Sequence, residues 1–159
     1  MAKAGMAFDS IGASLVRTSK KEWIPTGDGN EFLVLRISKE TGVWSALVKA
    51  KAGQVNVPHT HIGPADFYVL SGGFDYRGGS AREGDWVYEP AGAVHEATTH
   101  PVDTVYLANV HGPVAFHDGK GGFSYILDWR AVQKMVDTAA AKKKKPVSSI
   151  AAAKRKKAA

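Results

Sequence analysis

Three histidines stand at spacings that suit a metal site. His59 and His61 are two residues apart, and His95 follows 34 residues later in the segment EPAGAVH. On a strand, residues i and i+2 point to the same face, so the first two imidazoles would share one space. Two ligands hold an ion weakly, and His95 is the natural third. Together they predict a mononuclear site for a divalent metal with open coordination positions.

An isolated His-x-His pair is more often two polar strand residues that face solvent than a pair of ligands. The interpretation as a metal site therefore depends on the residues around the pair. Pro58 directly precedes it and favours extended geometry for Val57, as a strand requires.

The elements that must position these side chains are predicted to be short strands. β-branched and aromatic residues concentrate in short segments that glycine-containing turns separate. The expected strands are 32–38, 43–50, 67–72, 74–77, 85–89, 102–110 and 123–129. Strands this short are typical of an all-β sandwich or barrel. One helix is expected over 128–141, with Asp128 as its N-cap.

Length and composition limit the kind of protein. The 159 residues fit one domain, and the absence of Cys excludes disulfides, iron–sulfur clusters and thiolate metal sites. Any metal must therefore bind to histidines and carboxylates. No apolar run reaches the ~20 residues that a membrane span needs, and the N-terminus lacks the apolar region of a secretory signal. We expect a cytoplasmic protein.

The net charge of +6 comes from the C-terminal segment. Of the 21 Lys and Arg residues, eight lie in 138–159, so the remaining 137 residues carry 13 basic against all 15 acidic side chains. A body with this balance argues against a nucleic-acid-binding domain. The Lys/Ala-rich segment 138–159 is expected to be a disordered tail that could bind a polyanion, such as nucleic acid or an anionic surface, weakly. The predicted division is an N-terminal extension 1–27, a barrel 28–137 and this tail.

The residues around the histidines resemble the two motifs of the cupin superfamily. The first motif is matched by Gly53, His59, His61, Asp66 and Gly73, and the second by Gly84, Pro90, Gly92 and His95. Asp66 stands where Glu is usual, and Thr99 stands where Asn is usual. The resemblance implies an all-β, single-domain conical barrel of the jelly-roll type, with one metal ion inside held by His59, His61 and His95.

Within that superfamily, HTHIGPADFYVLSGGFDYRGG and HGPVAFHDGKGGFSYILDW are similar to the acetylacetone-cleaving (β-diketone) dioxygenases. They are also similar to the related dihydroxyacetophenone dioxygenase and ChrR-like cupins. The resemblance implies Fe(II) on three histidines and O₂-dependent cleavage of a carbon–carbon bond in a chelated β-diketone or hydroxyketone.

Other functions stay open, because a fold does not fix a function. One alternative is a non-catalytic cupin that senses a metal or ligand. Another is a cupin isomerase or lyase that uses Zn, Mn or Ni, since imidazole ligands suit all of these metals as well as Fe.

Asp66 is a candidate fourth ligand. It lies five residues after His61, an odd offset that would face the other way on an unbroken strand. The Gly63-Pro64 break leaves its direction open. The alternative is a role beside the ligands or in the structure.

Three further residues are candidates for catalysis. Glu89, just ahead of Pro90, could accept a substrate proton or orient a metal-bound water. Arg77 could stabilise the charge of an enolate. Thr98 could hydrogen-bond a ligated oxygen. Each also has an ordinary structural interpretation. Glu89 would be a solvated charge at a strand end, Arg77 part of a surface ion pair, and Thr98 a common strand residue.

The remaining aromatic and histidine residues have less specific expectations. Phe67, Tyr68 and Tyr106 could line an apolar pocket, although aromatics inside a barrel more often belong to its core. His100, His111 and His117 are expected in loops or at the surface, with His111 nearest the barrel mouth. A homo-oligomer is expected, because cupin barrels often pair through their edge strands.

Overall fold

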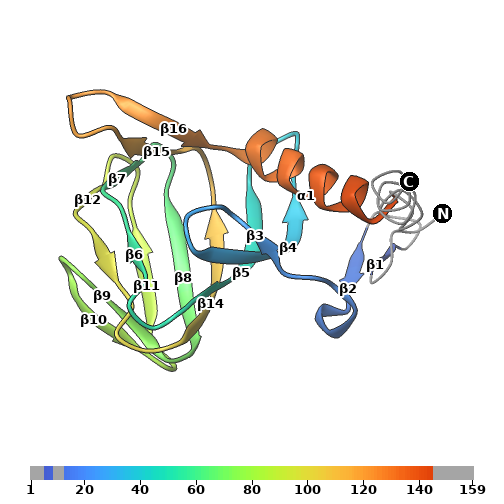
Figure 1. The fold of residues 1–159 in the computed structure, drawn as a ribbon, viewed down its shortest axis with the longest axis horizontal. Coiled ribbons are helices and arrows are strands. Elements are labelled where there is room, and N and C mark those ends of the chain that lie inside the picture. Colours follow the sequence, from blue (N-terminus) through green and yellow to red (C-terminus); the bar gives the residue numbers. More distant parts are fainter. Residues whose placement is uncertain (1–5, 9–12, 145–159) are drawn as a thin grey trace, which may run out of the picture.

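The computed structural model describes residues 6–8 and 13–144, and most of these form short antiparallel strands (Figure 1). The largest sheet has six strands in the order β11-β8-β14-β5-β4-β3. Their bounds are Ile24–Pro25 (β3), Asn30–Ile37 (β4), Trp44–Ala50 (β5), Ala65–Ser71 (β8), Trp86–Glu89 (β11) and Thr104–Val110 (β14). Buried and half-buried residues alternate along β5 and β14, so one face of this sheet is turned toward the interior.

Two four-stranded sheets, in the orders β12-β7-β15-β16 and β10-β9-β13-β6, enclose the other side. The first contains His59–His61 (β7), Val94–His95 (β12), Val114–His117 (β15) and Phe123–Leu127 (β16). The second contains Val55–Asn56 (β6), Gly73–Tyr76 (β9), Gly79–Arg82 (β10) and Thr98–Thr99 (β13). The expected all-β architecture is confirmed. Strands β6, β12 and β13 were not expected, because two residues are too few to show a period.

The N-terminal segment contributes to the fold at its end. Strand β1 (Met6–Phe8) pairs with β2 (Ser14–Val16), and a short 3₁₀ turn, η1 (Thr18–Lys20), follows. Strand β3 then joins the six-stranded sheet by pairing with β4. The last residues of the expected extension 1–27 are therefore part of the main sheet.

Helix α1 (Trp129–Lys144) packs against β3, β4 and β16. Asp128 caps it as expected, since its Oδ1 accepts hydrogen bonds from the backbone N–H groups of Arg130 and Ala131, both at 2.9 Å. Val132 is fully buried and anchors the helix to the hydrophobic core.

The helix continues farther than expected. It ends at Lys144, so the expectation of disorder from residue 138 onward is wrong for 138–144. Ala and Lys are strong helix formers, and here they extend a helix that is already nucleated and packed. Residues 145–159 of the expected tail lie outside the described residues. No helix in the described part of the chain combines the length and hydrophobicity needed to cross a bilayer.

A close contact between two glycines fixes the loop after β7. A Cβ added to Gly63 would lie 2.7 Å from the Cα of Gly112 and 2.8 Å from the carbonyl oxygen of His111. Only residues without a side chain allow these backbones to approach so closely. The contact holds the loop β7–β8 against the loop β14–β15, and so places β7 next to β15.

Candidate metal centre

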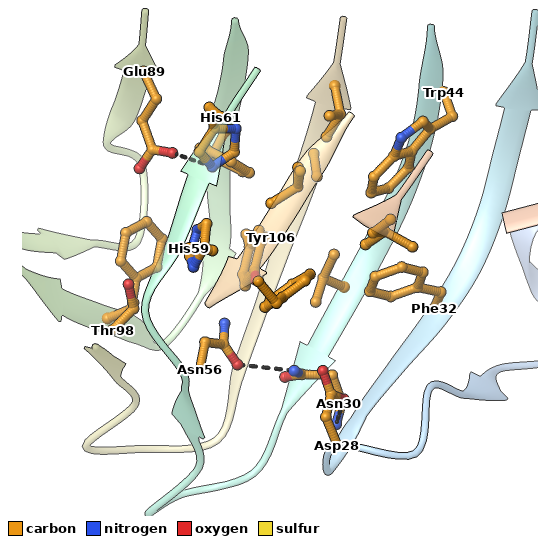
Figure 2. A pocket seen from close by; sticks show the side chains of 18 residues that line it. Asp28, Asn30, Phe32, Trp44, Asn56, His59, His61, Glu89, Thr98 and Tyr106 are labelled. Carbon is orange, nitrogen blue, oxygen red and sulfur yellow. Dashed lines mark hydrogen bonds and ion pairs between the residues drawn. The ribbon is translucent and has the colours of Figure 1, made fainter. Parts of the chain in front are cut away.

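Three imidazoles and one carboxylate meet inside the fold. Strand β7 carries His59 and His61, and its neighbour β12 pairs His95 directly with His59. Glu89 is the last residue of β11 and faces His61 (Figure 2). The potential ligand atoms of the four side chains all lie within 4.8 Å of one another, and all four are buried. The structure therefore brings together the three histidines expected as ligands.

One oxygen of Glu89 lies close to two of these histidines. Its Oε2 is 2.8 Å from Nε2 of His61 and 2.7 Å from Nε2 of His95. Burial by itself would raise the pKa of Glu89, but the two imidazoles outweigh it and lower the pKa to about 2. The carboxylate is therefore ionised at neutral pH.

His59 has a defined tautomer. Its Nδ1 lies 2.9 Å from the carbonyl oxygen of Val57, and because a carbonyl only accepts, Nδ1 must donate its hydrogen. Nε2 then keeps its lone pair for a metal, as in metal-bound histidines whose other nitrogen is hydrogen-bonded. Burial lowers the pKa of His59 to about 4, so the ring is neutral at pH 7.

These donor atoms fit a divalent metal ion. His61 Nε2 and Glu89 Oε2 are buried, and apart from the ion-pair contacts among the cluster residues they have no hydrogen-bond partner. Each buried polar atom in that state costs roughly 1–3 kcal/mol. A cation among the three imidazoles and the carboxylate would satisfy both atoms. Fe(II), Zn(II), Mn(II) and Ni(II) all accept such nitrogen and oxygen ligands.

The cluster borders a cavity of about 100 Å³ that is partly open to solvent. Its apolar lining consists of Phe32, Trp44, Val48, Phe67, Phe74, Tyr106, Ala108, Val110, Val114, Phe116 and Leu127. Asp28, Asn30, Asn56, His59, His61, Glu89 and Thr98 complete the wall. Apolar cavities of about this volume hold one small organic molecule.

Asp66 is not part of the cluster. Strand β8 turns Phe67 toward the cavity, so the preceding residue Asp66 points to the opposite face. There, Nδ2 of Asn109 donates to Oδ1 of Asp66 over 3.4 Å. This geometry gives no support to Asp66 as a fourth ligand. The acid that meets the histidines is Glu89.

The other two residues expected to be catalytic have contrasting surroundings. Thr98, on β13, is buried and lines the cavity. Arg77 is exposed in the turn between β9 and β10 and is not among the lining residues. The structure therefore places Thr98 with Glu89 at the site and Arg77 outside it.

His100 lies in the loop that follows β13, as expected, but it is not at the surface. Its side chain is 1% exposed, and its ring stacks on Tyr106 with 6.2 Å between the ring centroids. Its backbone N–H donates to the carbonyl of Gln54, and its carbonyl accepts from the N–H of Gly53. These two bonds hold the segment against the start of β6 and direct the ring inward.

The two remaining histidines lie outside the cavity. His111 is exposed, as expected, and its Nε2 is 3.8 Å from a carboxylate oxygen of Asp66. His117 is half-buried at the end of β15, and its Nε2 lies 2.8 Å from Oγ1 of Thr60. Thr60 alternates with the two histidines of β7, so it projects from the other face of that strand.

The expectation for the aromatic residues holds in part. Phe67 and Tyr106 line the cavity. Tyr68 points away from it and is 42% exposed.

Polar residues at the far end of the cavity were not identified from the sequence. Asn30, the first residue of β4, and Asn56, the last residue of β6, face each other there with Asp28 nearby (Figure 2). No motif marks them. The one available signal was that Asn30 precedes Phe32 by two residues, which places both on the same face of a strand.

Comparison with known proteins agrees with this geometry. The family model of the ChrR cupin-like domain matches residues 12–115. The chain is 28% identical over 129 residues to the acetylacetone-cleaving enzyme of Acinetobacter johnsonii, across 74% of this chain and 84% of that protein.

Solved structures show the same fold. A proposed acetylacetone dioxygenase from Methylibium petroleiphilum superposes with a TM-score of 0.73 and 27% identity, over 81% of this chain and 97% of that one. The acetylacetone dioxygenase of Acinetobacter johnsonii gives a TM-score of 0.69 and 24% identity, over 85% and 97%. These matches confirm the cupin fold and the resemblance to acetylacetone-cleaving cupins.

Proposed function

The chain belongs to the ChrR cupin-like family, and from that premise we propose that it is a mononuclear non-haem Fe(II) dioxygenase. Its substrate would be a small β-diketone or hydroxyketone, in which O₂ is used to cleave a carbon–carbon bond. The observation that carries this proposal is the buried His59, His61 and His95 set, with Glu89, at the wall of a small apolar cavity. The acetylacetone-cleaving relative supports the reaction type, because the similarity extends over 84% of that protein.

The three histidines would hold the metal and leave coordination positions open toward the cavity. When bound, Fe(II) would bring O₂ and the two substrate oxygens together at one centre. His59 contributes Nε2, because its Nδ1 is committed to Val57. The low pKa of His59 keeps this ligand free of a competing proton at neutral pH.

Glu89 has two roles open to it. Its Oε2 could serve as a fourth ligand, or it could accept the proton that a β-diketone loses when it becomes an enolate. The same oxygen faces both His61 and His95, so one role excludes the other at any moment. Glu89 is ionised in either case.

The remaining wall controls what surrounds the reacting atoms. Phe67 lies next to His61, with 6.1 Å between their ring centroids, and Phe116 lies 5.3 Å from His59. These rings limit the access of water and leave an apolar surface for the alkyl groups of a ketone. Thr98 offers a hydroxyl group in the same wall. Arg77 is exposed and has no part in this proposal.

The test combines metal content with O₂ uptake. Protein loaded with one equivalent of Fe(II) is offered a panel of β-diketones and hydroxyacetophenones in an oxygen electrode. Substrate-dependent uptake that disappears on chelation of the metal supports the proposal. No uptake with any of these ketones, at full iron occupancy, contradicts it.

His95→Ala provides the matched control. It removes one of three ligands, so stoichiometric metal should be lost while circular dichroism still shows the folded sheets. Retention of a full equivalent of metal by the variant would contradict the three-histidine site.

The family description also supports a second function, a cupin that senses a metal or ligand without turnover. A sensor predicts tight retention of zinc from purification and no O₂ uptake after exchange for Fe(II). A zinc-, manganese- or nickel-dependent isomerase or lyase predicts product formation without O₂. Metal content and O₂ uptake therefore separate the dioxygenase from the other two functions, and a product assay without O₂ separates those two from each other.

A further inference from the structure

The end of the cavity away from the metal cluster holds a short chain of polar groups. In Figure 2 Asn30 and Asn56 lie below Tyr106, whereas Glu89 and His61 lie above it. Asn30 Nδ2 donates to Asn56 Oδ1 over 2.8 Å, and the Asn56 side chain is hydrogen-bonded to the Tyr106 hydroxyl. All three residues line the cavity, most of whose wall is apolar.

One end of this chain is an acceptor without a donor. Asn30 is only 5% exposed, and its Oδ1 is buried without a hydrogen-bond partner. A buried amide oxygen in that state is costly, so native structures seldom leave one unmet. An unmet acceptor in the wall of a ligand-sized cavity indicates that the occupant supplies the donor.

The other end of the chain is a donor. Burial raises the pKa of Tyr106, and the hydrogen bond from Asn56 offsets part of that rise. Asn56 Oδ1 already accepts from Asn30, so the Nδ2 group of Asn56 is the one left to donate to the Tyr106 oxygen. The O–H of Tyr106 is then free to donate to a molecule in the cavity.

A hydroxyl group both donates and accepts, so one such group on a molecule in the cavity has the chemistry to pair with both free ends. We therefore infer that Asn30 and Tyr106 recognise a neutral hydroxyl group on the part of the substrate that is remote from the metal-chelating oxygens. This inference rests on the proposed function, because it requires a diketone or hydroxyketone anchored at the histidines. It narrows the substrate class to ketones that carry a hydroxyl-bearing arm.

Charge at the cavity rim favours a neutral group. Asp28 is exposed and lines the same end of the cavity. The backbone N–H of Asn30 donates to Oδ1 of Asp28 over 3.0 Å, so this negative charge lies beside the polar chain. A carboxylate on the substrate arm would be repelled there, whereas a hydroxyl would not.

The metal cluster and the polar chain are close in sequence, which favours a short arm between the chelating oxygens of the substrate and its hydroxyl. Asn56 precedes His59 by three residues, so even a fully extended backbone separates their Cα atoms by no more than about 10 Å. The probes therefore carry an arm of about three carbons between the diketone and the hydroxyl.

The test compares three probes on Fe(II)-loaded protein without O₂, with binding followed by calorimetry. 7-Hydroxyheptane-2,4-dione carries the hydroxyl, octane-2,4-dione replaces it with a methyl group, and 5,7-dioxooctanoate replaces it with a carboxylate. We expect the hydroxyl compound to bind about tenfold more tightly than the methyl compound, and the carboxylate to bind most weakly.

Two variants test whether the preference for the hydroxyl compound comes from the polar chain of Asn30, Asn56 and Tyr106. Asn30→Leu should abolish the preference for the hydroxyl compound while changing the affinity for octane-2,4-dione by no more than about twofold. Tyr106→Phe removes only the hydroxyl group, so it should reduce the same preference even if the Asn30 variant fails to fold.

Each other outcome overturns the inference in a recognisable way. Equal binding of the hydroxyl and methyl compounds to wild-type protein overturns it and leaves the proposed function intact. A preference that survives both substitutions overturns the assignment to Asn30 and Tyr106. Failure of all three diketones to bind overturns the proposed function and this inference with it.

Discussion

Glu89 and His95 are six positions apart in the sequence, and Oε2 of Glu89 lies 2.7 Å from Nε2 of His95 inside the fold. The intervening turn brings this about: the N–H of Gly92 donates to the carbonyl of His61, and the N–H of His61 donates to the carbonyl of Ala93. These backbone bonds fasten the turn to β7. An acid, three imidazoles and two strand ends are thereby assembled at one point.

This relationship predicts different consequences for the two acids near the site. Glu89→Gln keeps the shape but removes the charge, so turnover should fall by roughly 10²–10⁴-fold and metal affinity by about 10–100-fold. Asp66→Asn should leave the metal content unchanged, because Asp66 faces Asn109 on the other side of β8. Metal titration and O₂ uptake of the two variants side by side provide the check. Loss of metal from the Asp66 variant would contradict the arrangement described above.

The buried His100 predicts a dependence of stability on pH. Burial lowers the pKa of His100 from its ordinary value of 6.5, and the contact with the carbonyl oxygen of Gln54 and the nearby Asp75 offset part of the shift. The unfolded chain therefore binds a proton at this residue before the folded protein does. Stability should decline as the pH falls below about 6.5 and keep declining until the pH reaches the lowered pKa of the folded protein.

His100→Phe is the matched variant, because it keeps an aromatic ring beside Tyr106 and cannot titrate. Urea unfolding between pH 7 and pH 4 should give a shallower loss of stability for the variant than for the wild type. Identical slopes would show that His100 does not contribute to the acid sensitivity.

Much of the fold and part of the site could be predicted from the sequence. The segments expected at 43–50 and 102–110 correspond to β5 and β14, where buried and half-buried residues alternate regularly. The histidine spacing was informative, since ligands on one short strand must share a face. The spacing from His61 to Asp66 was not informative. Gly63-Pro64 interrupts the strand, so the sequence does not show which side of the next strand faces the interior.

Other parts of the site depend on contacts between distant segments. His100 precedes a proline and has the local sequence of a loop, and only its backbone pairing with Gln54 turns the ring inward. Asn30 and Asn56 are 26 residues apart and meet through the packing of two sheets. No local pattern carries that information, and isolated asparagines are usually read as turn residues.

The contact between Gly63 and Gly112 predicts non-additive mutations. Gly63→Ala would push a methyl group into the backbone of Gly112, and Gly112→Ala would do the reverse. Each substitution should destabilise the protein by about 2 kcal/mol, as overpacking typically does. Since both act at one contact, the double variant should lose less than the sum of the two. Denaturant unfolding of the three variants measures this, and strict additivity would show that the two glycines do not share the contact.

The helix boundary predicts where the basic segment can be removed. A chain that ends at Lys144 keeps all of α1, so its melting temperature, metal content and ketone turnover should match those of the full-length protein. A chain that ends at residue 137 loses the last turns of α1 and should melt at a lower temperature. Only the full-length protein should bind DNA or anionic vesicles at low salt, because most of the uncompensated positive charge lies after residue 144. Retention on DNA by the chain that ends at Lys144 would place polyanion binding in the body of the protein, and a fall in its turnover would give residues 145–159 a role in catalysis.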